Sequence, residues 1–233
     1  MVETRIQDGV LQVRADGYRW LATGWDGGYR DAPAAYNVSV PDGWDRTDLG
    51  TYTAERREAA GFGAEGPTLL TGVDLTHAAG ARLDSVAAIA TVGLSNPAAL
   101  PLEPDGSRPA GLVSGEAAAG TVNLLVGTER ALEDGALATL LSVAVEAKTA
   151  TVAALAGFSG TTSDAVVVGT DTGGEPRAFA GSATRVGDAT RAAVRRAVVE
   201  SFRSRYAEDK QPATVEAADA GIETSRKARA FDP

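Results

Sequence analysis

The chain of 233 residues contains no cysteine and a single histidine, and only three of its 22 basic residues are lysines. Without cysteine, the sequence excludes disulfides, thiolate nucleophiles and cysteine-rich zinc sites. One histidine, His77, excludes a metal site built from several histidine ligands. The net charge of −9 argues against nucleic acid and anionic membrane surfaces as partners, because both require basic patches.

The sequence also lacks an apolar signal core at its start, where Glu3 and Asp8 interrupt the first ten residues. We expect no apolar run long enough to span a bilayer. We therefore expect a cytoplasmic protein. Hydrophobic residues make up 44% of the chain and charged residues 23%, which are ordinary values for a soluble globular protein. An acidic surface with few lysines suits a salt-loving host, and a GC-rich genome is the alternative explanation.

The pattern of apolar residues predicts an α/β fold: a single domain over residues 1–233, with a mixed β-sheet, two long helices packed on it and a strand-rich N-terminal part. Residues 10–13 and 18–21 flank an Asp16-Gly17 turn and predict a hairpin. A long loop is expected at 97–120, and the tail at 208–233 is polar and unassigned. The other expected strands are 68–71, 84–93, 121–126 and 163–169, and the expected helices are 53–60, 133–156 and 187–206, the last capped by Asp188.

The clearest expected helix, residues 133–156, carries polar residues on an otherwise apolar surface. Thr139, Ser142, Glu146 and Thr149 follow at steps of three and four, so they form one stripe. Lys148 is two residues from Glu146, and the two side chains therefore point to different faces. A buried charge needs a partner or a chemical task, because its desolvation is costly. A structural ion pair and a catalytic role both account for these charges.

The connection that follows this helix, residues 157–164, is rich in glycine and hydroxyl side chains. Backbone N–H groups in such a turn can hold an oxyanion, and Asp164 at the start of the next strand is a candidate general base. Asn123 on a buried strand can donate to a carbonyl. In each case the structural alternative is a polar side chain that satisfies a neighbouring loop. For His77, a surface or capping role is favoured over a catalytic one.

Four short segments, taken together and in order, resemble the adenosylcobinamide amidohydrolase (CbiZ-type) family. They are residues 91–97 (TVGLSNP), 120–124 (GTVNL), 146–149 (EAKT) and 160–166 (GTTSDAV). The resemblance covers roughly residues 70–200. It departs from the expected pattern at Thr162, where a glycine is expected. His77 as an axial ligand to the cobalt of a corrinoid is a further option that the resemblance opens.

The resemblance implies hydrolysis of the amide that joins aminopropanol to the corrin ring of adenosylcobinamide. The product, adenosylcobyric acid, re-enters cobalamin synthesis in a salvage route of archaea and some bacteria. The alternative is a non-catalytic corrinoid-binding protein. The expected partner is the small-molecule corrinoid, with no nucleic acid, no membrane and a homo-oligomer as an open option. No resident cofactor is expected, and a carboxylate-bound divalent metal stays open.

The resemblance marks positions without an established catalytic residue, so the mechanism is argued from residue chemistry. In one route Glu146 or Asp164 activates a water, Asn123 or turn N–H groups hold the oxyanion, and Lys148 protonates the leaving amine. In the other, Ser163, Thr161 or Ser95 is the nucleophile and Lys148 its base. We favour the first route, with Glu146 at the scissile amide. The catalytic candidates are Glu146, Lys148, Asp164 and Ser163, and the substrate-binding candidates are Ser95, Asn96, Thr121, Asn123, Thr161 and Thr162.

Overall fold

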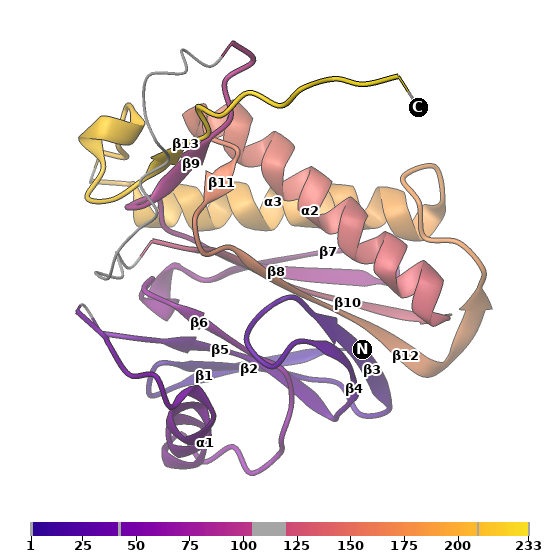
Figure 1. Cartoon of the computed structure of the whole chain (residues 1–233). Coiled ribbons are helices and arrows are strands. Elements are labelled where there is room, and N and C mark those ends of the chain that lie inside the picture. Colours follow the sequence, from indigo (N-terminus) through magenta and orange to yellow (C-terminus); the bar gives the residue numbers. More distant parts are fainter. Residues whose placement is uncertain (1, 42, 104–119, 209, 233) are drawn as a thin grey trace.

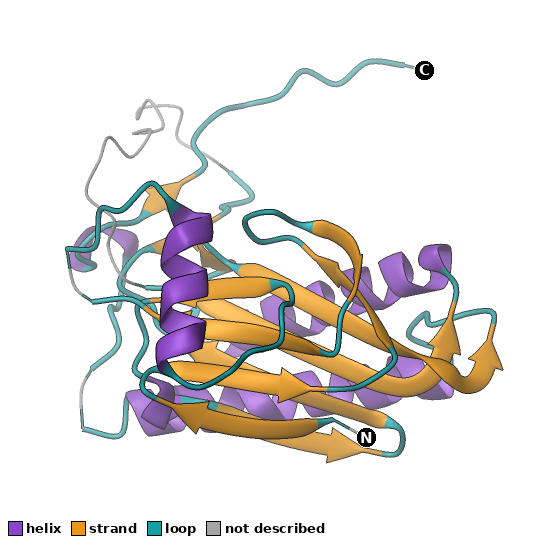
Figure 2. Ribbon diagram, turned by 90° about the horizontal axis from the view of Figure 1, so that it is seen from below, coloured by secondary structure: helices purple, strands orange, loops and turns teal. Residues whose placement is uncertain are grey.

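The computed structural model describes residues 2–41, 43–103, 120–208 and 210–232, and it stacks helices and sheets in four layers (Figure 1). Two long helices, α2 (Asp134–Ala156) and α3 (Arg185–Arg205), cover one face of a six-stranded sheet. The other face of that sheet packs on a four-stranded sheet, and α1 (Leu49–Ala59) covers the outer side of the latter. Figure 2, seen from below, shows α1 lying across the strands that it covers.

The six-stranded sheet has the order β4-β3-β12-β10-β8-β7, and β10 pairs parallel with β12 and antiparallel with β8. The parallel pair is joined by α2, which gives a strand–helix–strand unit with the helix on one face of the sheet. The six strands are β3 (Tyr18–Ala22), β4 (Gly28–Asp31), β7 (Ala79–Leu83), β8 (Val86–Val92), β10 (Val122–Leu132) and β12 (Ala165–Arg177).

The second sheet has the order β1-β2-β5-β6, and a small third sheet has the order β11-β9-β13. The third sheet joins segments from the middle and the end of the chain. The remaining elements are β1 (Glu3–Gln7), β2 (Val10–Arg14), β5 (Ala34–Ser39), β6 (Thr68–Thr71), β9 (Pro97–Ala99), β11 (Gly160–Thr161), β13 (Ile222–Glu223), and the short 3₁₀ helices η1 (Leu75–His77) and η2 (Val215–Ala217).

Strand β10 shows why its apolar run is continuous. Leu124 and Val126 pack on the helix side of the six-stranded sheet, and Leu125 packs between the two sheets. Successive side chains of a strand point to opposite faces, so a strand covered on both sides has no polar alternation. The structure thus confirms the predicted α/β class, with two long helices on a mixed sheet and a strand-rich N-terminal part, and it adds a second sheet as a separate layer.

The predicted hairpin across Asp16-Gly17 is wrong. Strand β2 pairs with β1 and β5 in the four-stranded sheet, whereas β3 pairs with β4 and β12 in the six-stranded sheet. The turn therefore carries the chain from one layer to the other. The tight hairpin lies one strand earlier, where Asp8 and Gly9 both have positive φ and join β1 to β2.

The two long helices agree with the predicted ones except at their ends. Helix α2 stops where Gly157 adopts the left-handed conformation with φ +79° and donates its N–H to Ala153. Helix α3 is capped by the Thr184 hydroxyl, which accepts from the Gly187 N–H at 3.0 Å, and not by Asp188, which lies in the first turn. The expectation for the loop at 97–120 falls largely on residues outside those described, apart from β9 at its start.

Helix α2 is long and apolar enough to cross a bilayer by length and composition alone, which corrects the expectation that the chain has no such run. Its apolar surface packs on the six-stranded sheet and on α3, and about half of the apolar window is buried in the protein. Burial in the core accounts for this composition.

Candidate active site

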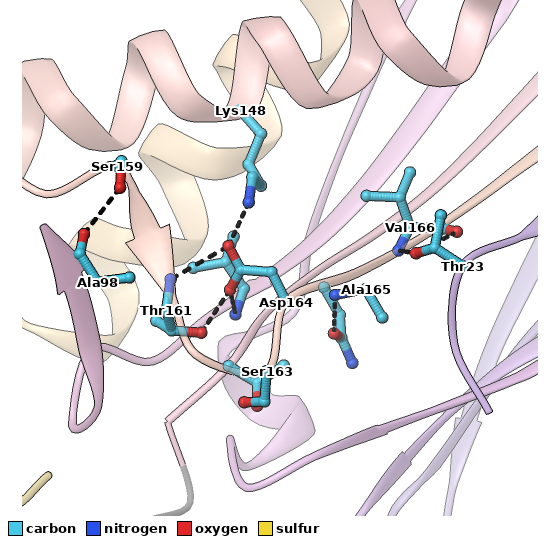
Figure 3. Close-up of polar contacts among 12 residues, drawn as sticks. Thr23, Ala98, Lys148, Ser159, Thr161, Ser163, Asp164, Ala165 and Val166 are labelled. Carbon is cyan, nitrogen blue, oxygen red and sulfur yellow. Dashed lines mark hydrogen bonds and ion pairs between the residues drawn. The ribbon is translucent and has the colours of Figure 1, made fainter. Parts of the chain in front are cut away.

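The sheet topology brings the four sequence segments that resemble one family to the same end of the six-stranded sheet. Residues 91–97 leave the carboxyl end of β8, and the antiparallel partner β10 begins beside them at Val122, opposite Val92. Strand β12 runs parallel to β10 and begins at the same end, with Ala165 opposite Asn123. The C-terminal part of α2 lies above this end, and Lys148 points from it toward Asp164 (Figure 3).

Lys148 and Asp164 form a buried ion pair at the centre of this site. Their side chains are 7% and 12% exposed, although Lys148 lies on a helix whose other charged residues face solvent. Besides Lys148, the Asp164 carboxylate accepts from the Val122 N–H at 2.9 Å, from the Thr161 N–H at 3.2 Å and from the Thr161 hydroxyl. With these four donors, the Asp164 carboxylate ties α2, β10 and β11 together.

Crowding and backbone conformation explain why residue 160, at the start of this turn, is a glycine. A Cβ atom at position 160 would collide with the Asp164 carboxylate and would lie 3.1 Å from the Lys148 Nζ. The backbone there also has φ +154°, which side chains disfavour. The ion pair therefore packs so closely on the backbone of residue 160 that only glycine fits at this position. The substitution of glycine by Thr162 falls two residues later, on the exposed part of the turn.

A group of hydroxyl and amide side chains lies next to the ion pair. The buried Asn96 donates from Nδ2 to the Thr162 hydroxyl at 2.8 Å and to the Ser163 hydroxyl at 3.3 Å. The Ser163 hydroxyl lies 2.9 Å from that of Thr121 and donates to the Gly120 carbonyl at 3.0 Å. Thr162 and Ser163 are exposed, so a ligand can reach them.

Ser95, the neighbour of Asn96, lines a pocket of about 600 Å³. The pocket lies between the strand ends and a C-terminal segment, and its volume falls in the usual range of ligand sites. Ser95 therefore lines the pocket, while the next residue, Asn96, points to the hydroxyls of Thr162 and Ser163. The remaining lining residues come from Gly72, Val73, Gly93, Arg205, Tyr206, Lys210, Gln211, Pro212, Ala213, Ala217, Ala218 and Asp219.

Glu146, our first choice for the scissile amide, is not part of this cluster. Its side chain is 59% exposed and forms an ion pair with Arg191 on α3. The polar stripe that contains Thr139 and Ser142 is the solvent face of α2. Two residues correspond to about 200° around a helix, so Lys148 points into the protein where Glu146 points out. The two side chains point to different faces, as expected, and Lys148 rather than Glu146 lies in the cluster around Asp164.

Asn123 also has a different position from the one expected of an oxyanion donor. It is fully buried, and its Nδ2 donates to the Asn37 side chain at 3.0 Å and to the Leu70 carbonyl at 2.8 Å. Its Oδ1 accepts from the Ala165 N–H at 3.2 Å. Asn37 continues this network to Thr91 at 3.0 Å. The network connects the two sheets, and its amide donors are committed to the protein.

His77 lies at the end of η1, where its Nδ1 is 3.0 Å from the Ser204 hydroxyl of α3. Asp74 caps this short helix, and the hydrogen bond from the Thr76 backbone N–H lowers the pKa of the Asp74 carboxyl. The position agrees with the structural role favoured for this histidine. Within residues 2–41, 43–103, 120–208 and 210–232, no group of three or more histidine, aspartate or glutamate side chains is arranged to hold a metal ion.

Sequence reasoning missed the part of the site that the C-terminal tail contributes. Seven residues between Lys210 and Asp219 line the pocket, but this segment carries no recognisable motif. It also lies far along the chain from the four segments that predicted the site. Tyr206 was expected only as the last residue of a helix, yet its hydroxyl accepts from the Leu94 N–H at 2.7 Å. No local pattern signals such contacts, because they form across more than 100 residues.

Comparisons with known proteins agree with the resemblance noted from the sequence. The family model described as adenosylcobinamide amidohydrolase (CbiZ) matches residues 2–210. A curated protein named adenosylcobinamide amidohydrolase, from Halobacterium salinarum, is 52% identical over 235 residues and covers both chains completely. The crystal structure of the PH0078 protein from Pyrococcus horikoshii OT3 has a TM-score of 0.43 and 12% identity over 86% of this chain and 78% of its own, which is too low to support an inference. By the family match and the identity to the Halobacterium protein, the chain belongs to the adenosylcobinamide amidohydrolase family.

Proposed function

We propose that the protein hydrolyses the amide between aminopropanol and the corrin ring of adenosylcobinamide and releases adenosylcobyric acid for corrinoid salvage. The observation that carries this proposal is the meeting of all four family-like segments at one end of the sheet, beside a pocket of about 600 Å³. Membership of the amidohydrolase family supports the reaction type and the substrate.

The two charged residues of the site act in this proposal as one positioning unit. Asp164 accepts from four donors, so its lone pairs are already used and it is a poor general base. Lys148 is paired with the same carboxylate. Together they fix the turn that leads to β12, with Thr162 and Ser163 on its exposed side. A rigid turn places hydroxyl groups at the substrate without reorganisation during the reaction.

Ser163 is the residue that we propose touches the reacting amide. Ser163 is an exposed residue, and its hydroxyl is oriented by Asn96, which donates to it at 3.3 Å, and by the Gly120 carbonyl, to which it donates at 3.0 Å. Hydrolysis adds water across the amide: the C–N bond breaks, the carbonyl carbon gains an oxygen, and the leaving amine gains a proton. We expect Ser163→Ala to lower kcat on the order of 100-fold, a usual loss when one polar group that contacts the reacting atoms is removed.

The test of the function is incubation of the purified protein with adenosylcobinamide, followed by chromatography of the corrinoid and amine products. The proposal predicts adenosylcobyric acid and aminopropanol in equal amounts, with far less of both from Ser163→Ala. A binding protein without activity would change the visible absorption of the corrinoid and release neither product. That outcome would replace the hydrolase by a corrinoid carrier.

We further propose that the enzyme works in the cytoplasm of a salt-loving archaeon. The net charge of −9, the scarcity of lysine and the relative from Halobacterium salinarum support this setting. The assay should therefore include molar potassium chloride, and activity is expected to rise as the salt screens the acidic surface.

A further inference from the structure

The last part of the chain forms a wall of the pocket beside the proposed catalytic site. Residues 210–225, called here the C-terminal clasp, follow α3 and return across the end of the six-stranded sheet. Figure 1 shows this yellow segment beside β9, which follows Asn96, and near β11, which leads into the turn to Asp164. The family model matches residues 2–210, so the clasp lies almost entirely beyond that match.

Specific hydrogen bonds hold the clasp against the segment that carries Asn96. The Ala220 N–H donates to the Ser95 carbonyl at 3.0 Å, and the Thr224 N–H donates to the Ala99 carbonyl at 3.0 Å. Strand β13 pairs parallel with β9, with Ile222 opposite Ala98. The clasp therefore continues a sheet whose other edge, β11, begins the turn to Asp164.

Close packing supports the same attachment. A Cβ atom at Gly221 would lie 3.0 Å from the Pro97 carbonyl oxygen and 3.2 Å from the Pro97 Cδ, so the clasp backbone lies directly against Pro97. Ser225, at the end of the clasp, is 3% exposed although the residues after it are exposed. These contacts fix the clasp in one position next to the site.

The clasp lines the pocket with three alanines and with the larger side chains of Lys210, Gln211, Pro212 and Asp219. Ala213, Ala217 and Ala218 line it, and across the pocket lie Gly93 and Ser95. The alanines leave room for a wide, rigid ligand, and Lys210, Gln211 and Asp219 offer polar groups to amide substituents at its edge. A corrin ring with its amide side chains is a ligand of this kind.

We propose that the C-terminal clasp is a specificity-determining wall that binds the corrin part of the substrate and leaves the chemical step to the site around Ser163. This inference rests on the proposed function for its substrate. Ser95 and Asn96 connect the two parts, since one lines the pocket and the next donates to Ser163. The clasp thus stabilises the bound substrate and its transition state to the same extent, which affects KM and not kcat.

The test is a tryptophan substitution in the wall, with a matched substitution outside it. Ala217→Trp and Ala213→Trp both change exposed alanines that line the pocket, so the bulk enters the pocket and not the core. Ala228→Trp changes an exposed alanine of the same tail beyond the clasp and serves as the control. We expect each wall variant to raise KM for adenosylcobinamide about tenfold or more with kcat within about twofold, and the control to change neither.

Equilibrium dialysis with adenosylcobinamide separates this inference from the proposed function. If the unaltered protein binds the corrinoid but releases no cobyric acid, the hydrolase proposal fails, and the dissociation constants of the wall variants still decide the role of the clasp. If hydrolysis occurs and both wall variants bind and turn over like the control, the clasp is no substrate wall. A loss of kcat at unchanged KM in these variants would also overturn the inference.

Discussion

Helix α2 takes part in two ion pairs, one through Lys148 and one through Glu146, that differ sharply in their exposure to solvent. Lys148 pairs with Asp164 at 7% and 12% side-chain exposure, whereas Glu146 pairs with Arg191 at 59% and 40%. The first pair has further hydrogen bonds from Val122 and Thr161, and the second faces water. On the same helix, Lys148 is therefore part of a buried network, and Glu146 is part of the solvent-exposed surface.

The comparison also predicts a difference in energy. Removing one member of a buried pair leaves an uncompensated charge, which typically costs about 3–5 kcal/mol. An exposed pair contributes about 0–1 kcal/mol, because water and salt screen it. The substitutions below are ordered from the largest expected effect to the smallest.

Asp164→Ala should have the largest effect on stability. The substitution leaves the Lys148 ammonium buried without its partner and removes the acceptor for Thr161 and Val122. We expect the free energy of unfolding to fall by about 3–5 kcal/mol, measured by urea denaturation at constant salt. A loss below about 1 kcal/mol would show that the pair is not buried in solution.

Lys148→Met should cost less than Asp164→Ala, since the carboxylate keeps its three other donors. We expect a loss of about 2–3 kcal/mol in the free energy of unfolding. The double variant Lys148→Met, Asp164→Ala removes both charges, so its loss should be smaller than the sum of the two single losses. Strict additivity in this cycle would argue against a direct interaction.

Gly160→Ala tests how closely the ion pair approaches the main chain. The added methyl group would collide with the Asp164 carboxylate, and we expect a loss of about 1–3 kcal/mol. Gly157→Ala is the matched control, because that residue has φ +79° and no atom near its Cβ position. The control carries backbone strain alone, about 1 kcal/mol. Equal losses in both variants would show that the methyl group at position 160 does not collide with the Asp164 carboxylate.

Glu146→Gln should have the smallest effect on stability. We expect a change below about 1 kcal/mol in the free energy of unfolding, shrinking further as potassium chloride is raised and the exposed pair with Arg191 is screened. Arg191→Gln should match it. A large, salt-independent loss in either variant would mean that this pair is buried in an assembly of chains.

The sequence indicated much of the fold, because its local signals were strong. The bounds of α2 follow from a long apolar segment that ends at Gly157, and β6 has the bounds 68–71 that were expected for this strand. The hairpin at Asp16-Gly17 failed for a physical reason: a turn signal shows where a chain reverses but not whether the next strand stays in the same sheet. Pairing of β3 with β12 involves residues about 150 positions apart.

The site was predicted as a group of residues but not as an arrangement. Asn96, Thr121, Lys148 and Asp164 do meet, because their segments share one end of the sheet. The buried face of α2 could not be identified from a helix that is apolar nearly all round, so Glu146 was preferred to Lys148. The partners of Asn123 and the C-terminal clasp depend on contacts between distant segments, and no local pattern encodes them.

The most direct measurement is the turnover of adenosylcobinamide by Glu146→Gln and Lys148→Met, assayed side by side after circular dichroism has shown that both are folded. Because Lys148 holds the turn of Ser163 and Glu146 faces solvent, we expect kcat of Glu146→Gln to stay within about twofold of the unaltered protein. For Lys148→Met we expect a fall in kcat on the order of 100-fold, because the turn that carries Ser163 loses its position. Loss of turnover in Glu146→Gln with normal turnover in Lys148→Met would contradict the account.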